Sequence, residues 1–313
     1  MQYLEALFKV LPVILLILTG IFLRKINLIG LETVQDIKKL VVNLTLPALL
    51  FLAFSRVNIE PPHLVIVAIV FSACLLALFL GRRVQPWSGI NQPHFPMLMS
   101  GFEAGMMGYA IFTAVYGAEN VFKFGIIDLG QVLFVFFVLV PSLQALTDPQ
   151  PFSQTVRNFF KTPVILAILG GILLSQTGLM ARLSTSPFVT SLTDTLTLVA
   201  SLTTPLVALI IGYEMRLQKG DLAGPLRSIA IRMAFWLPFA LLLSYGVIEH
   251  WLNLEKGFQA AVMTMFVLPP PFVIPIFMKE SKQNEQAYVV NSLSLASLVT
   301  LFAFAIVSVI YAP

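Results

Sequence analysis

The sequence predicts an all-α polytopic membrane protein with ten transmembrane helices, arranged as a five-plus-five inverted repeat with breaks in the fourth and ninth helices. Of the 313 residues, 58% are hydrophobic and only 11% are charged. A soluble domain carries about 25% charged residues, so the chain lacks the charges that a water-facing surface requires. The apolar residues form blocks of about twenty, the length of helix that crosses about 30 Å of hydrocarbon. In addition, the apolar stretch at residues 12–23 recurs 151 residues later, at residues 163–174.

Ten apolar segments are long enough to span a bilayer. They are roughly residues 7–23, 37–54, 62–80, 95–116, 122–142, 162–180, 190–212, 227–248, 257–278 and 287–311. The ten-residue alternation typical of a membrane β-barrel is absent. Glu5 precedes the first segment, Arg24 and Lys25 follow it, and no small-residue cleavage site appears. We therefore expect a retained first helix rather than a signal peptide.

The basic residues predict the orientation. Fourteen of the nineteen, with Arg216, Arg227 and Arg232 among them, fall in connections after odd-numbered segments, and five fall on the other side. Because basic loops stay in the cytoplasm, we expect residues 24–36, 81–94, 143–161, 213–226 and 279–286 to be cytoplasmic. The prediction is a multi-pass protein of the cell membrane with both termini outside the cytoplasm.

Two motifs indicate an internal repeat. Residues 12–23 and 163–174 are identical at nine of twelve positions, and Leu44–Pro47 resembles Leu202–Pro205. Chance similarity of two Leu/Ile-rich helices is the alternative, but matched Pro and Gly residues argue against it. We expect a first repeat over residues 1–150 and a second over 151–313. Because each holds five segments, the second enters the membrane from the opposite face, as in many secondary transporters.

The fourth and ninth segments contain helix-breaking residues near their middles. Three consecutive prolines cannot continue an α-helix, and broken backbone at membrane depth is tolerated only against protein or a wet cavity. Half-helix N-termini at such breaks suit an anionic group. Alternatively, Gly101 and Gly105 form a close-packing motif and the prolines form a kink without a ligand. The candidate substrate-binding residues here are Glu103, Gly105, Gly108, Pro269, Pro270 and Pro271.

Polar side chains inside the apolar segments supply further candidates. A carboxylate at mid-membrane costs roughly 2.5–3.5 kcal/mol on insertion scales, so Glu103 is a candidate proton carrier or cation ligand, or else it hydrogen-bonds a neighbouring helix. Asp128, three residues before Gln131, is a second coupling candidate, although a packing hydrogen bond is equally compatible. We expect solvated roles for Asp194, Glu214 and Asn291 near segment ends. Hydroxyl, amide and proline groups at two kinks complete the candidate substrate site: Asn43, Thr45, Pro47, Thr204 and Pro205.

Several chemistries lack their motifs. The sequence has no phosphate-binding loop for ATP and no basic run longer than two residues for nucleic acid. The only cysteine, Cys74, lies within the third segment, and His63, His94 and His250 are scattered. We therefore expect no enzyme activity, no metal site and no cofactor.

The stretch Val42–Phe51 resembles the second-helix signature of the auxin efflux carrier family, which includes plant auxin exporters and bacterial organic-acid carriers. Thr204–Gly212 is similar to that family's seventh helix, and Leu268-Pro269 followed by Phe277–Glu280 is similar to its ninth. The resemblance implies a bile-acid:sodium-symporter-like fold, with scaffold and transport subdomains interleaved across both repeats. It also implies that broken helices 4 and 9 cross where small carboxylates bind. Near Glu103 the sequence departs from the family pattern, which favours involvement of a proton or cation.

The leading hypothesis is a secondary transporter that carries a small organic anion by alternating access, coupled to protons or to the membrane potential. One alternative is a sodium-coupled organic anion symporter of the bile-acid type. Another is a membrane sensor that binds its ligand without moving it. The expected partners are the lipid bilayer, the anion and a coupling ion, with a homodimer as an open option.

Overall fold

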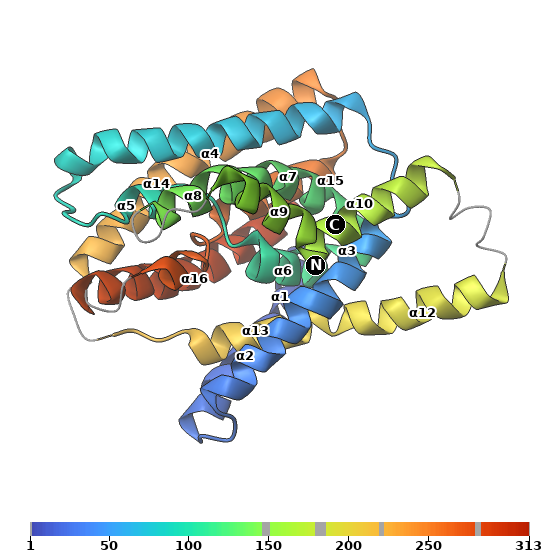
Figure 1. The fold of residues 1–313 in the computed structure, drawn as a ribbon, viewed down its shortest axis with the longest axis horizontal. Coiled ribbons are helices and arrows are strands. Elements are labelled where there is room, and N and C mark those ends of the chain that lie inside the picture. The colour runs from blue at the N-terminus through green and yellow to red at the C-terminus, as the bar shows by residue number, and fades with distance from the viewer. Residues whose placement is uncertain (1, 146–150, 179–185, 219–221, 279–282, 313) are drawn as a thin grey trace.

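The computed structural model describes residues 2–145, 151–178, 186–218, 222–278 and 283–312, which contain helices and connecting segments and no strand. In the first half (Figure 1), the elements are α1 Gln2–Lys25, α2 Leu31–Leu40, η1 Val41–Thr45, α3 Leu46–Phe54, α4 Pro61–Ser88, α5 Phe95–Met99, η2 Ala104–Gly108, α6 Tyr109–Tyr116, η3 Ala118–Asn120, α7 Val121–Phe134, η4 Val135–Leu139 and α8 Val140–Gln144. The second half has α9 Phe152–Lys161, α10 Pro163–Gln176, α12 Pro187–Ser201, α13 Thr203–Glu214, α14 Ala223–Leu241, η5 Leu242–Trp251, α15 Lys256–Val267, η6 Ile274–Phe277 and α16 Gln283–Ile310.

The described residues form a helical multi-span membrane protein. Seven helical stretches, one of them interrupted, are long and apolar enough to cross a bilayer, and there are eight spans if the pair α9–α10, bent by 62°, counts as one. They coincide with eight of the ten predicted segments. The first predicted segment lies in α1 and the ninth in α15 and the turn after it, and these two are not among the eight.

The fourth and ninth predicted segments are interrupted where glycine and proline predicted it. α5 ends at Met99, residues 100–103 are not helical, and a π-helical turn begins at Ala104. α15 ends at Val267 just before the prolines, because proline lacks the N–H group that the next helical hydrogen bond needs. The chain does not resume a full helix there: only the 3₁₀ turn η6 follows, in place of the expected second half-helix.

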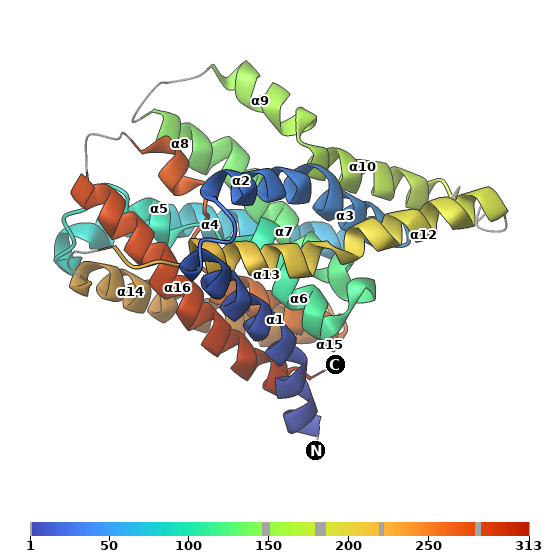
Figure 2. The same cartoon turned by 90° about the horizontal axis from the view of Figure 1, so that it is seen from below.

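Glycines bring two pairs of helices into close contact. α1 packs along α13, and α10 packs along α3. A Cβ atom on Gly20 would collide with the carbonyl oxygen of Leu209, and one on Gly171 would lie 2.8 Å from that of Phe51. Figures 1 and 2 show α10 and α12 projecting together beyond one end of the remaining helices. Large apolar side chains are exposed on most of the long helices, as a lipid-facing surface requires.

Candidate functional site

The two interrupted segments meet in the interior. The backbone N–H of Glu103 donates to the carbonyl oxygen of Pro269 at 2.9 Å. Gly101 has φ +70°, a conformation that side chains disfavour, and a Cβ there would lie 3.0 Å from Cγ of Pro271. Glycine at residue 101 therefore lets the fourth segment turn directly beside the prolines of the ninth. We call this meeting of residues 100–103 with residues 268–272 the crossing.

The carboxylate of Glu103 bridges the two sides of the crossing. Its Oε2 accepts a hydrogen bond from the backbone N–H of Phe272 at 2.6 Å, and its Oε1 accepts one from that of Met106 at 3.2 Å. The side chain is buried, with 8% of the residue exposed. The sequence predicted that such N–H groups would face a bound anion. In this structure, two of these N–H groups instead donate to a carboxyl group of the chain itself.

Arg232 donates hydrogen bonds to carbonyl groups at the C-terminal ends of both interrupted helices, α5 and α15. Its guanidinium donates to the carbonyl oxygens of Leu98 at 2.9 Å, Gly101 at 2.7 Å and Leu268 at 3.2 Å. It also lies over the ring of Phe102, 4.6 Å from the centroid. The last carbonyl groups of a helix lack intrahelical partners and carry partial negative charge, so a cation at this place stabilises both ends together.

Arg232, which was expected among the charges of the cytoplasmic connections, lies inside the protein, so that expectation was wrong. Only 1% of the residue is exposed, and it lies within α14. Removing it leaves thirteen basic residues on the predicted cytoplasmic side. The signal was present, because Arg232 stands inside an apolar segment, and an ionisable residue at such a place is a functional candidate by default.

Asp128 and Gln131 lie on one face of α7, as their spacing predicted, and there they contact each other. Nε2 of Gln131 donates to Oδ1 of Asp128 at 3.1 Å and to the carbonyl oxygen of Phe102 at 3.0 Å. The hydroxyl of Tyr109 donates to Oδ2 of Asp128 at 2.9 Å. Oε1 of Gln131 is buried and accepts no hydrogen bond from the described residues. α7 thus holds a polar cluster directly beside the crossing.

The glycine candidates differ in their surroundings. A Cβ on Gly105 would meet no atom within 4 Å, so Gly105 does not form the close-packing contact that was the alternative for it. A Cβ on Gly108 would lie 2.8 Å from Cδ1 of Leu268, so Gly108 lets the ninth segment approach. Pro269, Pro270 and Pro271 are all buried in the crossing.

The candidates at the two kinks are not all brought to the crossing. Asn43 is exposed, and its amide donates to the carbonyl oxygen of Lys39 one turn earlier. Thr45 is fully buried, with a hydroxyl that has no partner among the described residues. Thr204 donates to the carbonyl oxygen of Ala110 in α6 at 3.4 Å. Pro47 and Pro205 lie within the first turns of α3 and α13, both half-buried.

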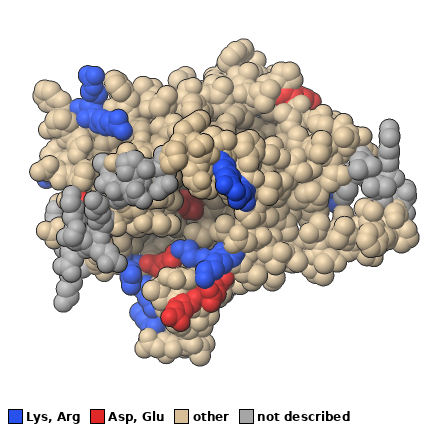
Figure 3. All heavy atoms as spheres, viewed as in Figure 1, with Lys and Arg blue, Asp and Glu red and all other residues tan. Residues whose placement is uncertain are grey.

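A pocket of about 430 Å³ extends from Phe272 at the crossing toward the ends of α1 and α13. Its wall is largely apolar, and charged residues stand at its rim. In Figure 3, charged side chains are sparse except around a hollow near α2. The lining residues are Arg24, Leu31, Lys38, Ile211, Tyr213, Glu214, Met215, Arg216, Phe272, Pro275, Ile276, Val290, Leu293, Ser294 and Ser297.

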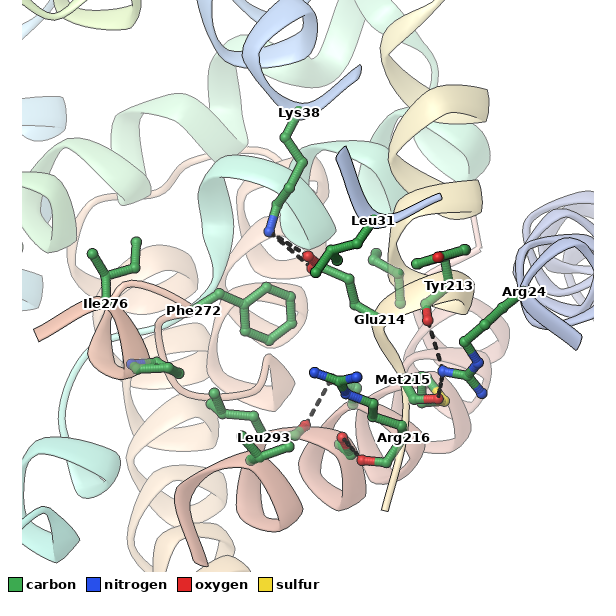
Figure 4. Close-up of a pocket in the computed structure, with 15 residues that line it drawn as sticks. Arg24, Leu31, Lys38, Tyr213, Glu214, Met215, Arg216, Phe272, Ile276 and Leu293 are labelled. Atoms are coloured by element: carbon green, nitrogen blue, oxygen red, sulfur yellow. Dashed lines mark hydrogen bonds and ion pairs between the residues drawn. The ribbon is translucent and has the colours of Figure 1, made fainter. Parts of the chain in front are cut away.

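Three basic residues and one acidic residue line this pocket. Nζ of Lys38 pairs with Oε1 of Glu214 at 2.7 Å, so the solvated role expected for Glu214 is replaced by an ion pair. Arg24 donates to the carbonyl oxygens of Tyr213 at 2.6 Å and Met215 at 2.8 Å. In Figure 4 the guanidinium of Arg216 points into the space beside Phe272. The excess of positive charge next to an apolar wall suits an anion that carries an apolar body.

Sequence reasoning missed this pocket because its charged residues come from separate connections of the chain.

Asn291, which was expected to be solvated, is buried in α16 and exchanges hydrogen bonds with the backbone of Gln218. Among the described residues, no group of three or more His, Cys, Asp or Glu side chains forms a metal site.

Comparison with known proteins assigns no family. No family model matches the chain, and no curated protein matches it. Function must therefore be argued from the crossing, the pocket and the polar cluster of α7.

Proposed function

We propose that this protein is a secondary transporter that carries a small organic anion across the membrane by alternating access. The observation that carries the proposal is the cationic pocket, which ends at the crossing of two broken segments. Broken helices at membrane depth form the substrate sites of many secondary transporters. The basic residues of the pocket would attract the anion, and its apolar wall would receive the rest of the substrate.

Alternating access needs two related halves, and paired contacts support an inverted repeat. By the two sequence matches, residue 20 corresponds to 171 at an offset of 151, and residue 51 corresponds to 209 at an offset of 158. Gly20 packs against the carbonyl of Leu209, and Gly171 packs against that of Phe51. Corresponding residues therefore make corresponding contacts, with the roles of the two halves exchanged.

A second pair of contacts follows the same rule. Arg24 donates to the carbonyl oxygen of Met215 at 2.8 Å, and Ser175 donates to that of Val57 at 2.8 Å. Residue 24 corresponds to 175, and residue 57 corresponds to 215, by the same two offsets. Chance similarity of apolar helices would not reproduce a hydrogen bond between side chain and backbone in both halves. These contacts support a scaffold built from α1, α3, α10 and α13.

Within this proposal the chain is an auxin efflux carrier-like protein, on the resemblance of its second, seventh and ninth segments. Coupling to protons or to the membrane potential would use Glu103 and Asp128. The sodium-coupled alternative is favoured by one observation, the grouping of oxygen atoms around Gln131. Its free Oε1 lies in the same cluster as the carboxylate of Asp128 and the carbonyl of Phe102, and oxygen ligands suit a hard cation.

Flux of radiolabelled mono- and dicarboxylates into proteoliposomes tests the proposal. Lys38→Gln and Arg216→Gln should raise the KM for the transported anion, because each removes a positive charge from the pocket. Lys39→Gln is the matched control, since Lys39 is 73% exposed and pairs with Asp36 outside the pocket. Equal effects of Lys38→Gln and Lys39→Gln on KM would contradict the assignment of the pocket.

Two gradients separate the alternatives. Uptake that follows an imposed pH or potential gradient, and is the same in sodium and in potassium, supports the leading proposal. Uptake that requires sodium and is lost in Asp128→Asn supports the symporter. Thermal stabilisation by an organic anion, with no flux under any gradient, would identify a sensor instead.

A further inference from the structure

Helix α9 is short, amphipathic and turned away from helix α10, which follows it. It covers Phe152–Lys161 and makes an angle of 62° with α10. In Figure 2, α9 lies along an edge of the molecule. The sequence predicts a cytoplasmic loop over residues 143–161, so this helix has no role in the predicted fold.

One side of α9 is anchored to the protein by aromatic contacts. The ring of Phe159 lies 5.0 Å from that of Phe137 and 5.3 Å from that of Phe136, both in η4. Thr155, one turn before Phe159, is also buried. The position of α9 is therefore set by packing and not only by its link to α10.

A second side of α9, which overlaps the first at Phe152, is apolar and exposed. Phe152 is 67% exposed although its ring also lies 6.0 Å from that of Phe137, and Phe160 is 53% exposed. Beyond the bend, the apolar surface continues along α10, where Leu166, Leu169 and Leu173 are exposed as well. Since α9–α10 together form one of the candidate spans, this continuous surface places Phe152 and Phe160 against lipid rather than water.

The third side of α9 is polar and basic. Ser153, Gln154, Arg157, Asn158 and Lys161 fall on one helix face by their spacing. Arg157 and Lys161 are both exposed, and the sequence from Pro151 to Thr193 has no acidic residue. A helix with basic residues on one face and aromatic residues on the other is typical of the bilayer interface.

We propose that α9 lies in the headgroup region of the bilayer and binds anionic phospholipid through Arg157 and Lys161. Phe152 and Phe160 enter the acyl boundary, Phe159 holds the helix to the protein, and the two basic side chains face the headgroups. The occupant is a membrane surface and not a protein partner, because the apolar side of α9 continues into the lipid-facing surface of α10. This inference does not depend on the transported substrate.

The depth of α9 can be measured in the full-length protein. Nitroxide labels on Phe160→Cys and Gln154→Cys, in a Cys74→Ser background reconstituted into nanodiscs, report collision with oxygen and with a water-soluble nickel complex. We expect the label at 160 to collide mainly with oxygen and the label at 154 mainly with nickel. Nickel access at both sites would overturn the proposal, because α9 would then stand in water. Protection of both sites from both reagents would point to a protein contact and would also overturn it.

Lipid charge is tested by native mass spectrometry of the protein from nanodiscs of phosphatidylcholine with and without phosphatidylglycerol. Each basic residue near an anionic surface contributes about a fivefold gain in binding, so Arg157→Gln with Lys161→Gln should lower retention of phosphatidylglycerol by roughly 25-fold. The charge-preserving pair Arg157→Lys and Lys161→Arg should retain it. A thermal transition that matches wild type shows that both double variants are folded. Unchanged retention in the glutamine pair, or full competition by inorganic phosphate, would overturn the lipid assignment.

Discussion

Glu103→Gln is the sharpest test of the crossing, because glutamine has almost the same shape as glutamate and only replaces one carboxyl oxygen by an NH₂ group. Oε1 and Oε2 of Glu103 accept N–H groups from Met106 and Phe272. A glutamine has one carbonyl oxygen to accept a bond, and its NH₂ group would face the other N–H. The variant therefore loses one of the two hydrogen bonds and places donor against donor.

The magnitude follows from the kind of bond that is lost. A hydrogen bond to a charged group contributes about 1.5–3 kcal/mol, and the short Phe272 contact of 2.6 Å belongs to this class. A loss of about 2 kcal/mol corresponds to roughly a 30-fold shift in the equilibrium between joined and separated segments. The backbone bond from Glu103 to Pro269 remains, so we expect local loosening rather than unfolding.

Hydrogen exchange followed by mass spectrometry measures this loosening at the amide of Phe272. We expect exchange there to accelerate by about 30-fold, while helices α4 and α14 exchange as before. Glu119→Gln is the control, because Glu119 is exposed in η3, away from the crossing. If protection at Phe272 is the same in Glu103→Gln and Glu119→Gln, the carboxylate does not hold the two segments together.

Three further predictions concern packing, charge and sidedness. Gly171→Ala should destabilise the protein by about 1–3 kcal/mol, because its Cβ would lie 2.8 Å from a backbone oxygen. The adjacent Gly170→Ala, whose Cβ would have its nearest atom at 3.6 Å, should be as stable as wild type or more stable. Thermal denaturation in detergent measures both variants. Arg232→Met should lower the free energy of unfolding by about 3–5 kcal/mol, because it leaves three carbonyl groups without their cation. Equal melting temperatures of this variant and wild type would contradict the account of the crossing. Arg56, which corresponds to Glu214 by the offset of 158, should face the substrate from the side of the membrane opposite to the pocket. Arg56→Gln should therefore raise KM only for anion that is added to that side of oriented proteoliposomes.

The features that sequence predicts well here are those fixed by the local backbone. The prolines end α15 at Val267, and Gly101 turns the chain between Met99 and Ala104. The spacing of Asp128 and Gln131 correctly placed both on one helix face, where the structure shows a hydrogen bond between them. These outcomes depend on neighbours in the chain and not on how the helices dock.

The features that sequence did not predict depend on docking between distant helices. The three acceptors of Arg232 come from two segments that are more than thirty residues away on either side, so its role appears only when α14 packs against both. The pocket charges Lys38 and Glu214 lie 176 residues apart. Helix α9 was overlooked for a different reason. Its many polar residues lower the average hydropathy, although the period of 3.6 residues typical of an amphipathic helix is present in the sequence.

Under the proposed transport function, the pairing of Glu103 with N–H groups and of Arg232 with carbonyl groups bears on how the unloaded protein behaves. Each partial charge named at the crossing already has a countercharge supplied by the chain, so no cargo is required to neutralise it. The crossing of such a carrier then adds little electrostatic cost when the protein reorients empty, which favours net movement down a gradient over obligatory one-for-one swapping. Efflux into a medium free of the anion should then be as fast as efflux into a medium that contains it.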